Sequence, residues 1–341
     1  MLKRFVYFIY YLKELDFSKV RLFSDYVRQE FEISKVKQWT HIIKCSFKYN
    51  ISILDYYLFK FYDISKKDMK SYAGTGYMYE YQLLMNPKIS RKILENKLEF
   101  LEAYRPFIKH SYISLADIST DKTRINKILS NDSRKIVLKD SVGQCGRGIE
   151  VRNCNEFNAV TLIDRLKKTG NDFVEDFVQQ HQKLNELSPS GLNTIRIITQ
   201  LNKKNEVDIL GARLRITINS PVDNLAAGNI AASINVKTGI VDGPGVYSDI
   251  TKKDEVKHPV TGVMIEGFQI PFWTQSVNLV KEAALSYKEN RSIGWDVAIT
   301  DNGPDLIEAN HDWCKLLWQL PIKKGLRPIL EKYKEEYLQK L

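Results

Sequence analysis

The sequence predicts an α+β protein in which a helical N-terminal region precedes a body of mostly antiparallel strands. Three observations support this class. Residues 1 to about 85 are rich in Tyr, Phe, Lys and Asp and contain few glycines, so we expect helices there. Later in the chain, short segments rich in Val and Ile are separated by turn residues, which is typical of strands. At 341 residues and 43% hydrophobic content, the chain is long enough for two or three lobes.

The first segment, MLKRFVYFIYYLKELDF, is expected to be a helix. Its apolar run, FVYFIYYL, ends at Lys13 and is not followed by a small-residue cleavage site, so we do not expect a signal peptide. The run is also too short to span a bilayer. Two interpretations stay open: a helix packed on the domain, or a basic, aromatic-rich helix that lies on a membrane surface.

The later elements follow from periodicity. Residues 86 to about 130 continue the helical pattern, with apolar residues at helical spacing in ISRKILENKLEFLEAYRPF. Strands are then expected in RKIVLKD, GIEVRN, DFVEDFV, LNTIRIITQL, EVDILGARLRI and IAASINV. One long helix interrupts the strands in TQSVNLVKEAALSYKEN, with Thr274 as its expected N-cap.

The net charge of +10, from 51 basic and 41 acidic residues, indicates an anionic partner. A nucleotide, a glycan acid, a membrane surface and a nucleic acid all satisfy this requirement. We do not expect nucleic acid, because the basic residues are spread along the chain and no nucleic-acid-binding motif is present. The four cysteines and five histidines show no metal-site spacing, and the cysteines are interpreted as reduced thiols of a cytoplasmic protein.

The first chemical motif is IVLKDSVGQCGRGIEV, residues 136 to 151, in which a strand leads from Lys139 into a loop with Gly143, Gly146 and Gly148. Glycines let backbone N–H groups approach phosphate oxygens, and a lysine beside the loop adds a positive charge. The motif is neither a Walker A sequence nor a dinucleotide-binding fingerprint. The alternative interpretation is an ordinary glycine-rich hairpin.

Three strand segments carry further charged residues. NDFVEDFVQQH places Glu175 on an apolar strand that is able to act as a nucleotide-binding hinge, although a half-buried strand is the simpler interpretation. LNTIRIIT places Arg196 on the next strand, and Arg213 and Arg215 in GARLRI share one strand face. Two arginines on one apolar face indicate an anion clamp, since unpaired buried charges are costly. A salt-bridged surface strand is the alternative.

The last motif is GWDVAITDNGPDLIEANHDW, residues 294 to 313, which is expected to form a β-hairpin around the turn signal DNGP. Glu308 and Asn310 share a face because they are two residues apart. An Asn302-Gly303 turn, the stronger local signal, would point Asp296 away from them. A three-residue loop that ends at a left-handed Gly303, or an equivalent bulge, would place Asp296 opposite Glu308.

Two carboxylates that face each other on neighbouring strands repel unless another charge offsets them. A divalent cation provides this charge, and Mg²⁺ prefers oxygen ligands and completes its shell with water and phosphate. A solvent-facing acidic hairpin is the competing interpretation.

In this order, the motifs resemble those of the ATP-grasp superfamily. The segments LNTIRIIT, VDNLAAGN, HPVTG and IGWDVAITDNGPDLIEAN resemble more closely the sugar-transfer-associated ATP-grasp family of bacterial surface-polysaccharide gene clusters. The resemblance runs from roughly residue 90 to 325 and implies two α+β lobes that hold ATP between them. We therefore expect a helical region over 1–85, a small lobe with the glycine flap over 86–174, a large lobe with the hairpin over 175–325 and a C-terminal helix over 326–341.

The resemblance also implies roles for the motif residues. Asp296, Glu308 and Asn310 would hold Mg²⁺ that bridges ATP phosphates, which requires the longer loop or a bulge in the hairpin. The transferred phosphoryl group would be stabilised by Arg215 together with Arg213 or Arg196. The expected nucleotide-binding residues are Lys97, Lys139, Gly143, Gly146, Gly148, Glu175 and Asp176.

The activity implied by the resemblance is that of an ATP- and Mg²⁺-dependent carboxylate–amine ligase that works through an acyl phosphate. Its expected substrates are a sugar acid or glycan precursor and an amino acid or amine. Two alternatives stay open: a kinase of a small hydroxyl acceptor, and a non-catalytic nucleotide- or glycan-binding module of a synthesis complex. We expect a cytoplasmic protein, at the inner face of the membrane if its first helix lies on lipid.

Overall fold

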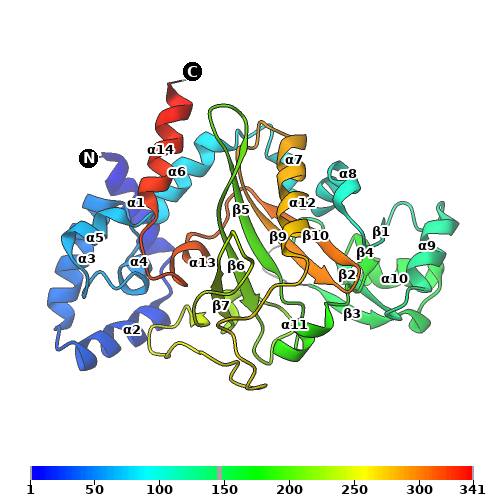
Figure 1. Cartoon of the computed structure of the whole chain (residues 1–341), viewed down its shortest axis with the longest axis horizontal. Helices are drawn as coiled ribbons and strands as arrows, with labels where there is room; N and C mark the ends of the chain where they lie inside the picture. Colours follow the sequence, from blue (N-terminus) through cyan, green and yellow to red (C-terminus); the bar gives the residue numbers. More distant parts are fainter. Residues whose placement is uncertain (1, 144–147, 340–341) are drawn as a thin grey trace.

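The computed structural model describes residues 2–143 and 148–339, which contain two antiparallel sheets flanked by helices (Figure 1). The small sheet has the strand order β1-β4-β2-β3. Its strands are β1 (Tyr112–Ser114), β2 (Lys135–Lys139), β3 (Glu150–Asn153) and β4 (Phe173–Asp176). Helices α9 (Lys122–Leu129) and α10 (Ala159–Thr169) cover it with a core of Ile, Leu and Val side chains.

The large sheet has the strand order β10-β9-β5-β6-β7-β8, and every neighbouring pair is antiparallel. Its strands are β5 (Ile195–Leu201), β6 (Val207–Ile216), β7 (Ile230–Ile234), β8 (Val246–Tyr247), β9 (Ser292–Thr300) and β10 (Gly303–Asn310). The six strand segments expected from Val and Ile content and the expected hairpin all contain strands, so this part of the prediction is confirmed. The α+β class is confirmed as well.

Residues 2–85 are mostly helical, as predicted. They form α1 (Leu2–Lys13), α2 (Phe17–Glu30), α3 (Lys35–Tyr49), α4 (Ile53–Leu58), α5 (Lys66–Ser71) and α6 (Thr75–Met85). Polar side chains at Asp16, Ser34, Ser52 and Ser65 cap four of these helices, because each accepts a hydrogen bond from a backbone N–H of the first turn. An aromatic-rich core joins these helices to the β7–β8 end of the large sheet through Ala231 and Val246.

The remaining helices cover the large sheet. A core cluster combines strand residues of this sheet with α7 (Lys92–Glu95), α8 (Lys97–Ala103) and α12 (Trp273–Ser286). Another joins α6, α13 (Lys315–Gln319) and α14 (Arg327–Leu338) to Ile198 of β5. Helix α11 (Gln182–Leu187) and the 3-10 turns η1 (Arg105–Phe107), η2 (Cys154–Glu156) and η3 (Leu225–Ala227) complete the described elements.

Two local expectations were wrong. Strand β1 lies in the region where we expected helices, because it pairs with the edge of β4, a partner about sixty residues away. Helix α12 begins at Trp273 rather than after a Thr274 cap, and the preceding Phe272 is left-handed, with φ of 53°. The buried Trp273 donates its indole N–H to the Val236 carbonyl, so tertiary packing determines where this helix starts.

Within the described residues, no helix is long and apolar enough to cross a membrane.

Candidate active site

A bulge in the β9–β10 hairpin brings two carboxylates face to face. The turn itself is short, since Thr300 pairs directly with Gly303, whose φ is 98°. The register then shifts between Leu306 and Glu308, so that Glu308 pairs with Asp296. The three-residue loop expected at Gly303 is therefore wrong. A β-bulge, which we gave as the alternative to that loop, produces the predicted pairing of Glu308 with Asp296.

Two arginines neutralise Asp296. Arg196 on the adjacent β5 donates from Nε and Nη2 to its two carboxylate oxygens, at 2.5 and 2.9 Å, and Arg215 of β6 donates from Nη1 at 2.9 Å. Burial alone would raise the pKa of Asp296, but the two guanidinium groups outweigh burial and lower it. Arg215 also pairs with Asp223 at 2.7 Å. Asp296 is therefore a buried anion held by cations from two other strands.

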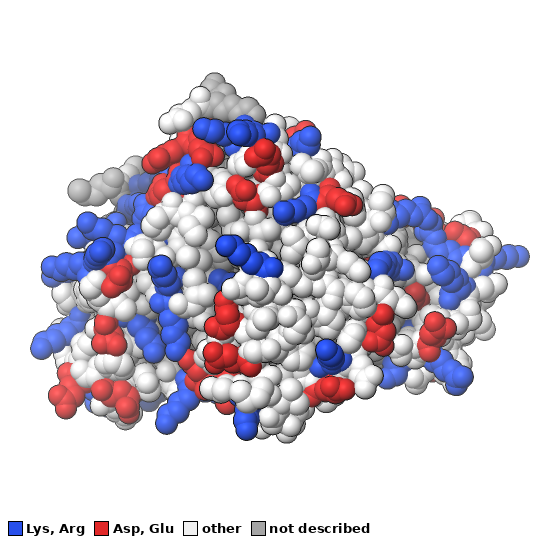
Figure 2. Space-filling model, viewed as in Figure 1, with Lys and Arg blue, Asp and Glu red and all other residues white. Residues whose placement is uncertain are grey.

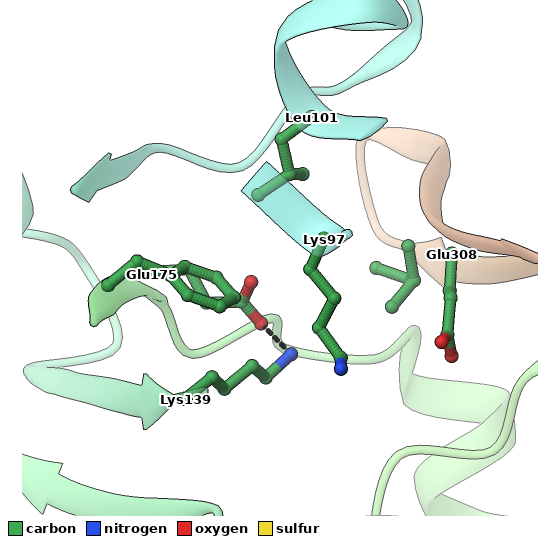
Figure 3. Close-up of a pocket in the computed structure, with 7 residues that line it drawn as sticks. Lys97, Leu101, Lys139, Glu175 and Glu308 are labelled. Carbon is green, nitrogen blue, oxygen red and sulfur yellow. Dashed lines mark hydrogen bonds and ion pairs between the residues drawn. The ribbon is translucent and has the colours of Figure 1, made fainter. Parts of the chain in front are cut away.

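Glu308 is in a different electrostatic state. Its pKa is raised, first by burial and then by the negative charge of Asp296, and the cations of Lys97, Arg196 and Lys139 oppose this only in part. The side chain lines a pocket (Figure 3). Figure 3 draws one interaction among the pocket residues, between Lys139 and Glu175. It draws none to Glu308. The neighbouring cations thus offset the cost of ionising Glu308 only in part.

The pocket collects four of the residues predicted from sequence. Its lining comprises Lys97, Leu101, Lys139, Phe173, Glu175, Ile307 and Glu308. In Figure 3 the Lys97 ammonium group lies between the Lys139–Glu175 pair and the Glu308 carboxylate. These side chains come from α8, the two central strands of the small sheet and β10, so the pocket lies between the two sheets.

Local structure positions the two lysines. Asn96 caps α8 by accepting from the N–H groups of Leu98 and Glu99, and Lys97 is therefore the first helical residue. The Lys97 ammonium group donates to the Gly143 carbonyl, at the start of the glycine loop. The Lys139 ammonium group forms an ion pair with Glu175 across β2 and β4. Protein oxygens therefore hold both ammonium groups in the pocket.

The donor set fits a magnesium ion that completes its shell with phosphate and water. The described residues contain no cluster of three or more His, Cys, Asp or Glu side chains, so they do not form an all-protein metal cage. A Mg²⁺ ion needs only one or two carboxylates when phosphate and water supply the rest. Glu308 would provide the first carboxylate, whereas arginines already use three of the roughly four acceptor positions of Asp296. Asn310 lies two residues beyond Glu308 on the same strand face.

Sequence reasoning missed His110. The Nδ1 atom of this buried imidazole lies 2.9 Å from the Asp305 carboxylate of β10, and its Nε2 lies 3.8 Å from the Glu175 carboxylate without a hydrogen bond. Asp305 also accepts from the backbone N–H groups of Lys109 and His110. His110 thus lies between Asp305 of the large sheet and Glu175 of β4 in the small sheet. No local pattern marks a lone histidine before a three-residue strand.

Two predicted site residues lie elsewhere. Asp176 follows Glu175 on β4 and so points to the opposite face, where it accepts from the Ser111 N–H and the Asn131 amide. Arg213 donates to the carbonyls of Trp318 and Ala212, and burial lowers its pKa to about 10. Asp176 is therefore not part of this pocket, and Arg213 does not join the arginines at Asp296.

The glycine loop is described only in part. Gly143 accepts from Lys97, and Gly148, with φ of 74°, precedes β3. Gly146 lies outside the described residues.

Comparison with known protein families found one match, which covers the segment that contains the pocket. Residues 77–335 match the family described as sugar-transfer-associated ATP-grasp. No curated protein matches the chain.

Three solved structures match parts of the chain at low sequence identity. A Campylobacter jejuni biotin carboxylase in complex with β-γ-ATP is 13% identical, with 73% of this chain and 47% of that chain covered and a TM-score of 0.46. A Bacillus anthracis D-alanine–D-alanine ligase is 15% identical, with 73% and 69% covered and a TM-score of 0.39. A Bacillus licheniformis L-amino acid ligase is 13% identical, with 70% and 49% covered and a TM-score of 0.39. The chain spans about half the length of the first and third of these proteins.

The family match covers most of the chain and includes every residue that lines the pocket. The protein therefore belongs to the sugar-transfer-associated ATP-grasp family.

Proposed function

We propose that this protein is an ATP- and Mg²⁺-dependent carboxylate–amine ligase. The observation that carries the proposal is the pocket between the two sheets, where Lys97 and Lys139 lie beside the incompletely compensated Glu308. Asp296, with its two arginines, lies directly opposite Glu308. This set of charges suits the binding and transfer of a phosphoryl group, a reaction in which positioning and electrostatic stabilisation supply most of the catalysis.

Each group has a distinct part in the proposal. Lys97 and Lys139 bind the phosphates of ATP, and in doing so exchange the Gly143 carbonyl and the Glu175 carboxylate for phosphate oxygens. Glu308, Asp296 and Asn310 would hold Mg²⁺, which when bound neutralises phosphate charge.

Arg196 and Arg215 place two positive charges beside this site. Both are buried or nearly so, and both are held by Asp296, so their guanidinium groups are already oriented. Preorganised cations of this kind stabilise charge that develops on a transferring phosphoryl group without further rearrangement.

The proposed reaction has two steps. A substrate carboxylate oxygen attacks the terminal phosphorus of ATP, and ADP leaves. The amine nitrogen then attacks the acyl carbon, loses a proton, and inorganic phosphate leaves. The family points to a sugar acid or glycan precursor as the carboxylate, joined to an amino acid or amine, and we place the reaction in the cytoplasm.

ADP release with candidate carboxylates, in the presence of hydroxylamine, tests the proposal. We expect ADP and a hydroxamate, because hydroxylamine traps an acyl phosphate. A phosphorylated hydroxyl acceptor without hydroxamate would instead identify a kinase. Nucleotide binding without ADP release for any acceptor would indicate a binding module.

A further inference from the structure

Helix α1 has an apolar face that the described protein does not cover. Leu2, Phe5, Val6 and Ile9 are spaced as one stripe along the helix, and their side chains are 79%, 53%, 57% and 51% exposed. The opposite face packs on the protein, where Tyr11 is buried beneath the helix. Folding therefore buries only one of the two apolar faces of this helix, and the other face stays exposed to solvent.

One basic residue of α1, Lys13, lies in line with this stripe. The other two contact the protein, since Lys3 pairs with Glu80 of α6 at 3.0 Å and Arg4 lies on the packed side of the helix with its Nη1 buried. The helix itself contains no acidic residue. Residues 1–85 hold fourteen basic and nine acidic residues, which is half of the net charge of +10 in a quarter of the chain. Figure 2 shows Lys and Arg side chains gathered at the left edge of the molecule, over the helices of this region.

The charge pattern selects the partner of the stripe. A second copy of the chain, packed stripe to stripe, would bring together two N-terminal regions that each carry fourteen basic and nine acidic residues, so their net positive charges would repel. An anionic lipid surface satisfies both features, because its acyl region accepts the apolar stripe and its headgroups attract Lys and Arg. Helix α1, at 12 residues, is suited to lying along such a surface.

We propose that α1 binds this protein to the surface of an anionic membrane, with Leu2, Phe5, Val6 and Ile9 inserted at the headgroup level. The proposal does not depend on the proposed ligase activity, because none of the residues that line the nucleotide pocket belongs to α1.

Co-sedimentation of the full chain with vesicles tests the proposal. We expect binding to vesicles of phosphatidylcholine mixed with phosphatidylglycerol, weaker binding to pure phosphatidylcholine, and a decrease with added salt. The double variant Phe5→Ser/Ile9→Ser should lower partitioning roughly tenfold or more, since two apolar side chains leave the interface. Lys13→Gln should lower it by about fivefold, the contribution of one basic residue near an anionic surface.

Ile89→Ser is the matched control, because Ile89 is 85% exposed but lies outside α1. It should leave vesicle binding unchanged. All variants should unfold at the wild-type temperature and release ADP at the wild-type rate without vesicles, since the replaced side chains are largely exposed. Equal binding to both vesicle types, or binding unaffected by the double variant or by Lys13→Gln, would overturn the proposal. So would a concentration-dependent oligomer that Phe5→Ser/Ile9→Ser dissociates without any vesicle binding.

Discussion

The Glu308→Gln substitution separates the effect of this carboxylate on stability from its proposed role in magnesium binding. In the structure, burial and the charge of Asp296 raise the pKa of Glu308, so its ionised form is less stable in the folded protein than in the unfolded chain. Each unit of such a shift corresponds to about 1.4 kcal/mol of folding free energy at a pH above both pKa values. The amide keeps the shape of the side chain and removes the charge.

The sign of the effect on stability follows from proton binding. Below the unfolded pKa, both states carry the proton and the shift has no effect. As the pH rises toward the raised folded pKa, the unfolded chain releases its proton first, and the wild-type protein loses stability. The ligand-free Glu308→Gln protein should therefore match the wild type in acid and be more stable at neutral pH. Denaturant unfolding at a series of pH values measures this difference.

Catalysis should change in the opposite direction. Loss of a metal-binding carboxylate should lower Mg²⁺-dependent ADP release at least 10- to 100-fold, the loss typical of groups that only support a metal ligand. Thermal unfolding with ATP should also become insensitive to whether Mg²⁺ or a chelator is present. If the variant is less stable than wild type at neutral pH, the inference that nearby cations only partly compensate the charge of Glu308 is wrong. If it keeps its Mg²⁺ dependence, Glu308 is not a ligand.

Three further predictions concern the surroundings of the pocket. Lys139→Met should weaken ATP binding and cost about 3–5 kcal/mol of stability, because it leaves Glu175 buried without its cation. Adding Glu175→Gln should restore stability but not ATP affinity in calorimetry, and restored affinity would argue against a phosphate contact. Burial lowers the pKa of His110, but the charges of Asp305 and Glu175 outweigh this effect and raise it. The stabilisation that this imidazole provides should be complete below about pH 6.5 and fade as the pH rises through the folded pKa. Thermal unfolding of His110→Gln should lack this pH dependence, and identical profiles would exclude the effect. Gly294→Ala should cost about 1–3 kcal/mol and slow turnover, because its Cβ would lie 2.6 Å from a tryptophan Cβ and 3.1 Å from an arginine Cδ at Asp296. Gly243→Ala, with open space at its Cβ, is the control, and equal losses in both variants would refute the steric argument.

Local sequence patterns determined much of this protein. The Val- and Ile-rich segments predicted the strands from β2 to β7, and alternation around DNGP predicted the β9–β10 hairpin. The spacing of Glu308 and Asn310 placed both on one face, because side chains two residues apart on a strand always share a side. The same strand segments contain Lys139 and Glu175, which we named as candidate nucleotide-binding residues, and both line the pocket.

Tertiary structure decided the rest. The bulge before Glu308, rather than the turn, sets its pairing with Asp296, and the turn preference alone pointed to another register. The assignment of Arg196 to Asp296 and of Arg213 to the Trp318 carbonyl depends on which strands and helices become neighbours. His110 lies beside Glu175 because Asp305, almost two hundred residues later, binds the chain before β1. Periodicity in a sequence encodes the face of one strand, whereas contacts between distant strands arise only when the shared core brings those strands together.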